Sequence, residues 1–281
     1  MPLKLIRKAY NFSTGFGSFF SVKKIILALT ALLILFLQGC AFFSPRHKPQ
    51  LLFTDHDIEN IIQDVKLQEG MVAGFYSTGT LTINGWILDS SVDIFFAGKK
   101  DPLMLKLEIS HSWGKPLIYF LIKEDTLAVR DFTEKRQYTG RFSPEGLSRF
   151  LPNMDCSSDM IWAFLRGYPQ FASHVHSYEG SPGVLILEDR NRDIIGKVTF
   201  SSDEGVIEAV SSPPRFLTME FTDFRKTGEI DYAEKTVLKD IKGKRDLTLK
   251  RNKVIFNRDI PDAIFTLENQ PAFEIIDLDK M

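Results

Sequence analysis

Residues 103–123 read Leu-Met-Leu-Lys-Leu-Glu-Ile-Ser-His-Ser-Trp-Gly-Lys-Pro-Leu-Ile-Tyr-Phe-Leu-Ile-Lys, and this stretch decides the fold. In its first part, from Leu103 to Ile109, every second residue is apolar, while Lys106 and Glu108 point the other way. That alternation predicts a strand with one buried face. After a short loop, Leu117–Lys123 is almost wholly apolar, which predicts a strand covered on both faces. The two strands place a β-sheet at the centre of the domain.

Strand patterns continue on both sides of this pair. Asn84-Gly85 is the residue pair that a two-residue type I′ hairpin turn prefers, because both of its central positions need a positive φ. A short helix or turn at Pro261–Ile264 precedes a last extended piece. The further predicted strands are residues 72–83, 86–97, 126–131, 135–140, 184–188, 194–200, 206–210, 216–223, 231–239 and 245–256. The order of elements indicates a mainly β fold of the α+β class, an antiparallel sheet with inserted helices.

A helix is predicted before the first strand. Thr54 can cap it and Asp57 stands three residues on, a variant of the capping box. Apolar residues recur at helical spacing, and Gly70 ends the pattern. The residues of this stripe are Ile58, Ile61, Ile62 and Val65.

Two more helices are predicted at about residues 143–166, between the two groups of strands. Ser143 followed by Pro144 is a typical helix start, with serine as the cap and proline at the first position. The second helix begins after Ser157 or Ser158, and Gly167 and Pro169 close it. We expect this helical pair to lie over the sheet as a lid.

The N-terminal segment has the pattern of a bacterial lipoprotein signal. An apolar run over residues 25–37 follows Lys23 and Lys24, and Leu37-Gln38-Gly39-Cys40 resembles a lipobox. Cleavage would leave Cys40 as the new N-terminus with a diacylglycerol on its thiol. The alternative is an uncleaved N-terminal membrane anchor. Ala41 favours the outer membrane by the sorting rule of enteric lipoproteins, with the protein facing the periplasm.

This reading divides the chain into residues 1–39 as signal peptide, 40–53 as lipidated tether and 54–281 as one domain. The segment 1–39 holds five basic residues and no acidic one, so its removal changes the net charge from −1 to −6. A negative charge argues against a nucleic-acid partner.

With Cys40 lipidated, Cys156 is the one thiol left in the chain. A lone cysteine is more often a buried small hydrophobic residue than a nucleophile.

Several short motifs, taken in order, resemble the LolA/LolB lipoprotein-carrier family, and most closely its LolB-like outer-membrane lipoproteins. They are Thr78-Gly79-Thr80-Leu81, Leu105-Lys106-Leu107 with Trp113-Gly114-Lys115-Pro116-Leu117, Tyr138-Thr139-Gly140, Leu165-Arg166-Gly167-Tyr168-Pro169, and Ile260-Pro261-Asp262-Ala263-Ile264-Phe265-Thr266-Leu267. The resemblance implies an unclosed antiparallel β half-barrel whose open mouth is plugged by helices. It also implies a protein that binds acyl chains or lipoproteins in an apolar cavity and helps to insert them into the outer membrane. Acylated lipoproteins or other lipids, and possibly a soluble LolA-like carrier, would be its partners.

Strand parity and the lid helices supply the residues expected to line such a cavity. They are Phe75, Leu81, Ile94, Phe96, Leu105 and Leu107 from the sheet, and Leu147, Phe150, Ile161 and Phe164 from the lid. The alternative is that these residues form an ordinary core, because an apolar alternation marks a core first.

The loop over residues 111–116 resembles the hairpin through which LolB is thought to meet the membrane. Trp113, followed by Gly114, matches the protruding apolar residue there, and tryptophan suits a bilayer interface. The alternative is that Trp113 folds back onto the sheet.

No motif of an enzyme, cofactor or metal site stands out. His174 and His176 with Glu179 could share a metal in an extended segment, but a surface pair is the more common reading. We therefore expect no enzyme, no cofactor and no metal. Two other classes stay open: a structural or assembly lipoprotein that uses the sheet as a docking surface, and a hydrolase of envelope glycolipid. A sealed core would favour the first, and convergent polar groups in a cavity would favour the second.

Overall fold

The computed structural model describes residues 52–84, 90–151, 156–171, 173–201, 205–240, 245–268 and 270–281. The signal segment and Cys40 lie outside these residues. Residues Pro49–Met281 form one compact unit with its own hydrophobic clusters, the property of a domain that can fold alone. In the part of the chain that is described, no helix is both long and apolar enough to cross a membrane.

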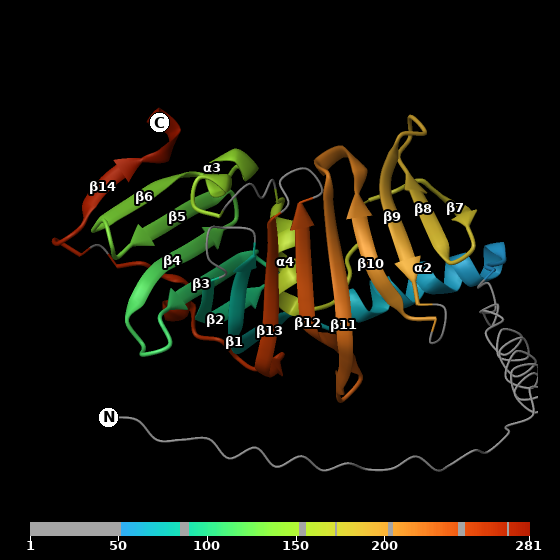
Figure 1. The fold of residues 1–281 in the computed structure, drawn as a ribbon, viewed down its shortest axis with the longest axis horizontal. Helices are drawn as coiled ribbons and strands as arrows, with labels where there is room; N and C mark the ends of the chain where they lie inside the picture. The colour runs from blue at the N-terminus through green and yellow to red at the C-terminus, as the bar shows by residue number, and fades with distance from the viewer. Residues whose placement is uncertain are drawn as a thin grey trace, which may run out of the picture. The chain divides into compact units, whose positions relative to one another are not determined.

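Fourteen strands of the described residues form one sheet (Figure 1). They are β1 (Gly74–Asn84), β2 (Ser90–Lys99), β3 (Met104–Ser110), β4 (Pro116–Lys123), β5 (Thr126–Asp131), β6 (Arg136–Arg141), β7 (His176–Ser181), β8 (Val184–Glu188), β9 (Ile194–Phe200), β10 (Ile207–Ser212), β11 (Leu217–Thr227), β12 (Ile230–Asp240), β13 (Arg245–Phe256) and β14 (Glu274–Asp277).

The sheet is ordered β14-β6-β5-β4-β3-β2-β1-β13-β12-β11-β10-β9-β8-β7 and does not close on itself. Neighbouring strands are antiparallel except β14, which runs parallel to β6. The first and last long strands meet at the centre, where β1 pairs with β13. This confirms the predicted unclosed antiparallel sheet.

Among the described residues, three α-helices accompany the sheet: α2 (Asp55–Gly70), α3 (Pro144–Ser148) and α4 (Ser158–Arg166). Thr54 and Asp57 form the predicted capping box of α2. Ser143 caps α3 and Ser157 caps α4, while Gly167 ends α4 in the left-handed conformation. Figure 1 shows α4 behind β12, which it contacts, and α2 along the half of the sheet that holds β7–β10.

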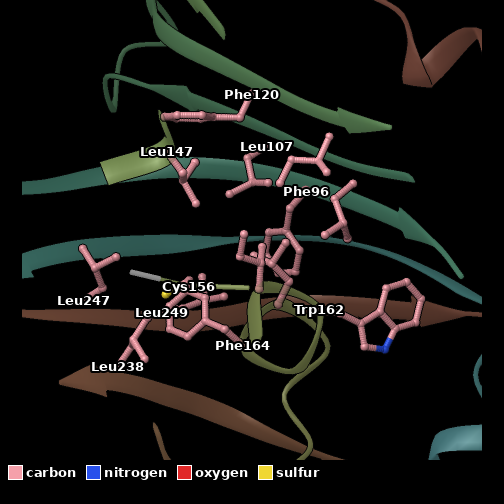
Figure 2. Close-up of a cluster of buried hydrophobic side chains, with 14 of the residues drawn as sticks. Phe96, Leu107, Phe120, Leu147, Cys156, Trp162, Phe164, Leu238, Leu247 and Leu249 are labelled. Carbon is pink, nitrogen blue, oxygen red and sulfur yellow. The ribbon is translucent and has the colours of Figure 1, made fainter. Parts of the chain in front are cut away.

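Two hydrophobic clusters lie on the helix-bearing face of the sheet. The larger joins β1–β6, α3, α4 and β11–β13, and Figure 2 shows its centre, where Phe96, Phe120, Trp162 and Phe164 meet leucines of the sheet. The smaller packs α2 through Ile58 and Val65 onto Leu185, Leu187, Val198, Phe200 and Ile207. Each half of the sheet therefore has a core of its own.

A third cluster covers the other face of β2–β5. The 3₁₀ helix η3 (Asp262–Phe265) and its neighbours bring Ile260 and Phe265 onto Ala97, Met104 and Leu121. This placement explains the apolar residues in the C-terminal motif Ile260–Leu267. Strand β4 is covered on both faces for the same reason, as its sequence predicts.

Three details of the sheet differ from the sequence-based predictions. Ile83 pairs with Ser90, a register that a two-residue turn at Asn84-Gly85 does not give; the turn itself, over residues 85–89, lies outside the described residues. Strand β7 was not predicted, because its sequence His-Ser-Tyr-Glu-Gly-Ser has no apolar alternation. The last extended piece, which contains β14, joins the sheet in parallel rather than antiparallel pairing.

Candidate functional site

A cavity of about 550 Å³ lies between α4 and strands β8–β11. The C-terminal end of α2 and the segment that follows α4 complete its wall. The cavity sits where the two clusters on this face meet, and Val210 packs against both of them. Residues of α4 and of β8 face this space from its two sides.

Nine of the seventeen residues that line the cavity are apolar or glycine, and the other eight, which include Ser157 and Arg215, are polar or charged. Met160 and Ala163 come from α4, and Phe171 from the segment after it. The sheet contributes Leu187, Ile195, Gly196, Val210, Met219 and Phe221. The flexible thioether side chains of Met160 and Met219 give the wall an adaptable surface, as methionine does in many apolar binding sites.

Polarity changes along the cavity. Leu187 is fully buried at one part of the wall, and Phe221 is 2% exposed. Asp159 and Ser173, which also line the cavity, are exposed to solvent. The polar serines Ser211 and Ser212 are half-buried. The cavity thus has deeply buried apolar wall residues and an exposed polar rim, and we use "mouth" for the exposed part of its rim at Asp159 and Ser173.

One polar network ties the cavity wall together. Lys100 Nζ lies 2.5 Å from Glu69 Oε1 at the end of α2, and Gln170 Nε2 donates to the same carboxylate at 3.1 Å. Both Glu69 and Gln170 line the cavity. The network joins the segment after α4 to the end of α2, because one carboxylate oxygen accepts from both partners.

Arg251 of β13 anchors the C-terminal end of α4 to the sheet. Its guanidinium is buried and donates to the carbonyls of Leu165, at 3.0 Å, and of Phe164. It also donates to Ala233 O at 2.9 Å and Thr236 Oγ1 at 2.8 Å. Burial lowers the pKa of Arg251 to about 9. The cation suits this place because a helix C-terminus carries partial negative charge.

A second buried arginine stands at the junction of α2 and α4. Arg166 donates to the carbonyl of Gln68 at 2.6 Å, and its guanidinium lies 4.6 Å from the ring centre of Tyr168. Burial lowers its pKa to about 10. Sequence reasoning placed Arg166 in a motif but gave it no role, and it did not single out Arg251.

The ten predicted cavity residues occupy another place. They come together as parity and the lid pattern predicted, but in the larger packed cluster, where Phe150 is half-buried and the other nine are buried. None of the ten is among the residues that line the cavity of 550 Å³. In this structure they act as core, and a role for them in lipid binding stays a prediction.

Trp113 protrudes from the loop between β3 and β4. Its side chain is 72% exposed and stacks on His111, with ring centres 4.1 Å apart. Gly114 N–H donates to His111 O at 2.8 Å, and Gly114 has a φ of +83°. The alternative in which Trp113 folds back onto the sheet is therefore wrong. Contact of Trp113 with a membrane remains a prediction.

The other residues considered as metal ligands or as a nucleophile have ordinary structural roles. Glu179 accepts from the backbone N–H groups of Phe53 and Gly183. Among the described residues, no group of three His, Cys, Asp or Glu side chains could hold a metal ion. Cys156 is buried in the larger cluster.

Solved structures share this architecture. A DUF1329 family protein from Desulfovibrio piger matches with a TM-score of 0.53 at 12% identity, over 74% of this chain and 97% of that one. The chain shares the fold of that protein. A LolA superfamily protein from Nitrosomonas europaea matches with a TM-score of 0.43 at 14% identity, over 73% of this chain and 97% of that one. No family model and no curated protein matches the sequence.

Two glycines of the motifs quoted from the sequence lie where the structure leaves no room for a side chain. At Gly79, where β1 shifts register against β13, a Cβ atom would lie 2.4 Å from Lys250 O. At Gly167, with a φ of +80°, a Cβ atom would lie 2.7 Å from Ala233 O and 2.8 Å from the guanidinium carbon of Arg251. Both glycines permit close contacts in this fold, one within the sheet and one between α4 and the sheet.

Proposed function

We propose that the protein is an outer-membrane lipoprotein that faces the periplasm, binds acyl chains or lipoproteins in its apolar cavity, and assists their transfer into the membrane. The observation that carries the proposal is the cavity of about 550 Å³ between the two cores. This volume lies within the range of about 300–1,000 Å³ that is typical of small-ligand sites.

An acyl chain suits this cavity for a physical reason. It brings no polar group that must be paired, so it can enter an apolar space and leave it again. A structural or assembly lipoprotein would need only a sealed core and an outer docking surface. The open space between α4 and β8–β11 favours the carrier over that second class.

The anchor and the partners follow from the sequence. Cys40 would carry the acyl groups that fix the protein to the membrane, and two or more chains make such an anchor stable. Residues 41–53 would be the tether that lets the domain reach its cargo. A soluble LolA-like carrier that delivers the cargo completes the proposal.

The loop with Trp113 is the proposed point of contact with the bilayer. Its exposed indole has an apolar body and one N–H group, the combination that is common at membrane interfaces. Stacking on His111 holds the ring outward, away from the sheet.

A transfer assay tests the proposal. The protein is loaded with an acylated peptide and mixed with liposomes, and the appearance of the peptide in the liposomes is measured. Val210→Trp, which fills the cavity, should abolish loading. Glu208→Trp places the same indole on an exposed position of the same strand and should load like the wild type. Equal loading of both variants would contradict the proposal.

A further inference from the structure

We infer that the cavity holds one acyl chain at a time, tail inward and polar head at the mouth, so that its ligand is a single-chain lipid. A free fatty acid and a lysophospholipid share this chemistry. The inference rests on the proposed function. Of the two ligand classes named there, acyl chains and lipoproteins, it selects the acyl chains of single-chain lipids, because a lipoprotein carries two or more chains.

The volume sets the number of chains. A methylene group is close in size to a water molecule, whose share of the liquid volume is about 30 Å³. The 550 Å³ of the cavity therefore admits about 18 such groups, which is one long acyl chain. A second chain of equal length would need the same volume again.

The walls limit expansion of the cavity. Leu187 belongs to one packed cluster, and Met219 and Phe221 belong to the other. The side chains of each cluster therefore pack against the wall residues and fix their positions. The α4 side is fixed by Arg251 and by Ala233, whose N–H donates to Gly167 O at 2.6 Å. Room for a second chain would require α4 to leave these partners.

The polarity of the wall sets the direction of the chain. Leu187 and Phe221 are buried at the apolar part, whereas Asp159 and Ser173 are exposed at the mouth. A tail that entered the other way would bury its head group among apolar side chains without hydrogen-bond partners, which is costly. The head group therefore stays at the mouth.

Chain-length dependence tests the inference on the soluble unit of residues 49–281. Dissociation constants are measured for saturated fatty acids and for lysophosphatidylcholines, each from about 8 to 22 carbons, and for diacyl phosphatidylcholine. Affinity should rise about fourfold per added CH₂. It should level off near 18 carbons, with one molecule bound per protein. The two single-chain series distinguish a free carboxylate head from a phospholipid head, and a plateau in either supports the inference.

A matched pair of variants locates the bound chain. Ile195 lines the cavity, while the neighbouring Ile194 is 38% exposed and does not line it. Ile195→Trp should move the plateau to shorter chains by a few carbons, and Ile194→Trp should leave it unchanged. Melting curves of both variants confirm that they are folded. A plateau that does not move in folded Ile195→Trp would overturn the assignment of the chain to this cavity.

Two outcomes separate this inference from the proposed function. Diacyl phospholipid bound as tightly as the single-chain lipids, or affinity that keeps rising well beyond 18 carbons, would overturn the one-chain inference and leave the carrier proposal standing. Absence of binding for every lipid and for acylated peptide would overturn both.

Discussion

At the scale of the single residue, a buried cation holds the lid to the sheet. Arg251 is 2% exposed and satisfies carbonyl groups of Phe164 and Leu165 at the end of α4. The sequence does not reveal this role, because Arg251 stands among polar and basic residues of β13, where a solvated arginine would look the same. A guanidinium is suited to the place because its several N–H groups reach different acceptors at once.

Arg251→Met tests this anchor. The variant leaves the carbonyls of Leu165 and Ala233 buried without their donor, which should lower the free energy of unfolding by about 3 kcal/mol. Urea denaturation measures the change. Lys250→Met, at the exposed neighbouring position, is the control and should change stability by less than about 0.5 kcal/mol. Equal effects of the two substitutions would show that Arg251 does not anchor α4.

At the scale of the element, start signals and periodicity predicted most helices and strands. The capping box at Thr54 and Asp57, the proline start of α3 and the glycine end of α4 lie where the sequence places them. Strand β7 escaped prediction because an edge strand needs no apolar alternation. The register of β1 and β2 was not predicted either, since a local turn preference does not fix how two strands pair over their full length.

The capping box of α2 makes stability depend on pH. The hydrogen bond from Thr54 lowers the pKa of Asp57 below its ordinary value of 3.8. The stabilisation is therefore complete above pH 3.8 and is lost as the pH falls through the lower pKa of the folded state. The difference in unfolding free energy between wild type and Asp57→Ala should be constant near neutral pH and shrink in acid. A difference that grows on acidification would contradict this sign.

The loop between β3 and β4 allows a test of membrane contact. Because Trp113 is 72% exposed, Trp113→Ser should change the free energy of unfolding by less than about 0.5 kcal/mol. It should nevertheless slow the transfer of acylated peptide into liposomes. Tyr178→Ser removes another exposed aromatic side chain, from strand β7, and serves as the control. If Trp113→Ser transferred the peptide as fast as the wild type, this loop would not contact the membrane during transfer.

At the scale of the whole molecule, one sheet supports two cores and leaves a cavity between them. The sequence predicted the fold class and the two helices α3 and α4. It did not predict which apolar residues pack and which line the cavity, because parity assigns a face but not a neighbour. Phe96 and Leu107 belong to the packed cluster that contains residues of α4, whereas Leu187 and Phe221, buried as well, line the cavity.

Ligand binding should stabilise the whole domain. A ligand that binds only the folded state at 100 times its dissociation constant adds about 2.7 kcal/mol to the free energy of unfolding. For a domain of this size, that corresponds to a rise of roughly 5–11 °C in the melting temperature. Thermal unfolding with and without a long-chain fatty acid measures the shift. Val210→Trp, with its cavity filled, should show none; an equal shift in this variant would place the ligand elsewhere.

The carrier function is tested most directly by native mass spectrometry of the domain without its signal and Cys40, after the domain has been incubated with bacterial membranes and purified again. We expect a bound mass that corresponds to an acylated molecule, absent from Val210→Trp and present in Glu208→Trp. A ligand-free mass that persists after challenge with fatty acid, lysophospholipid and acylated peptide would contradict the carrier function and favour a docking lipoprotein.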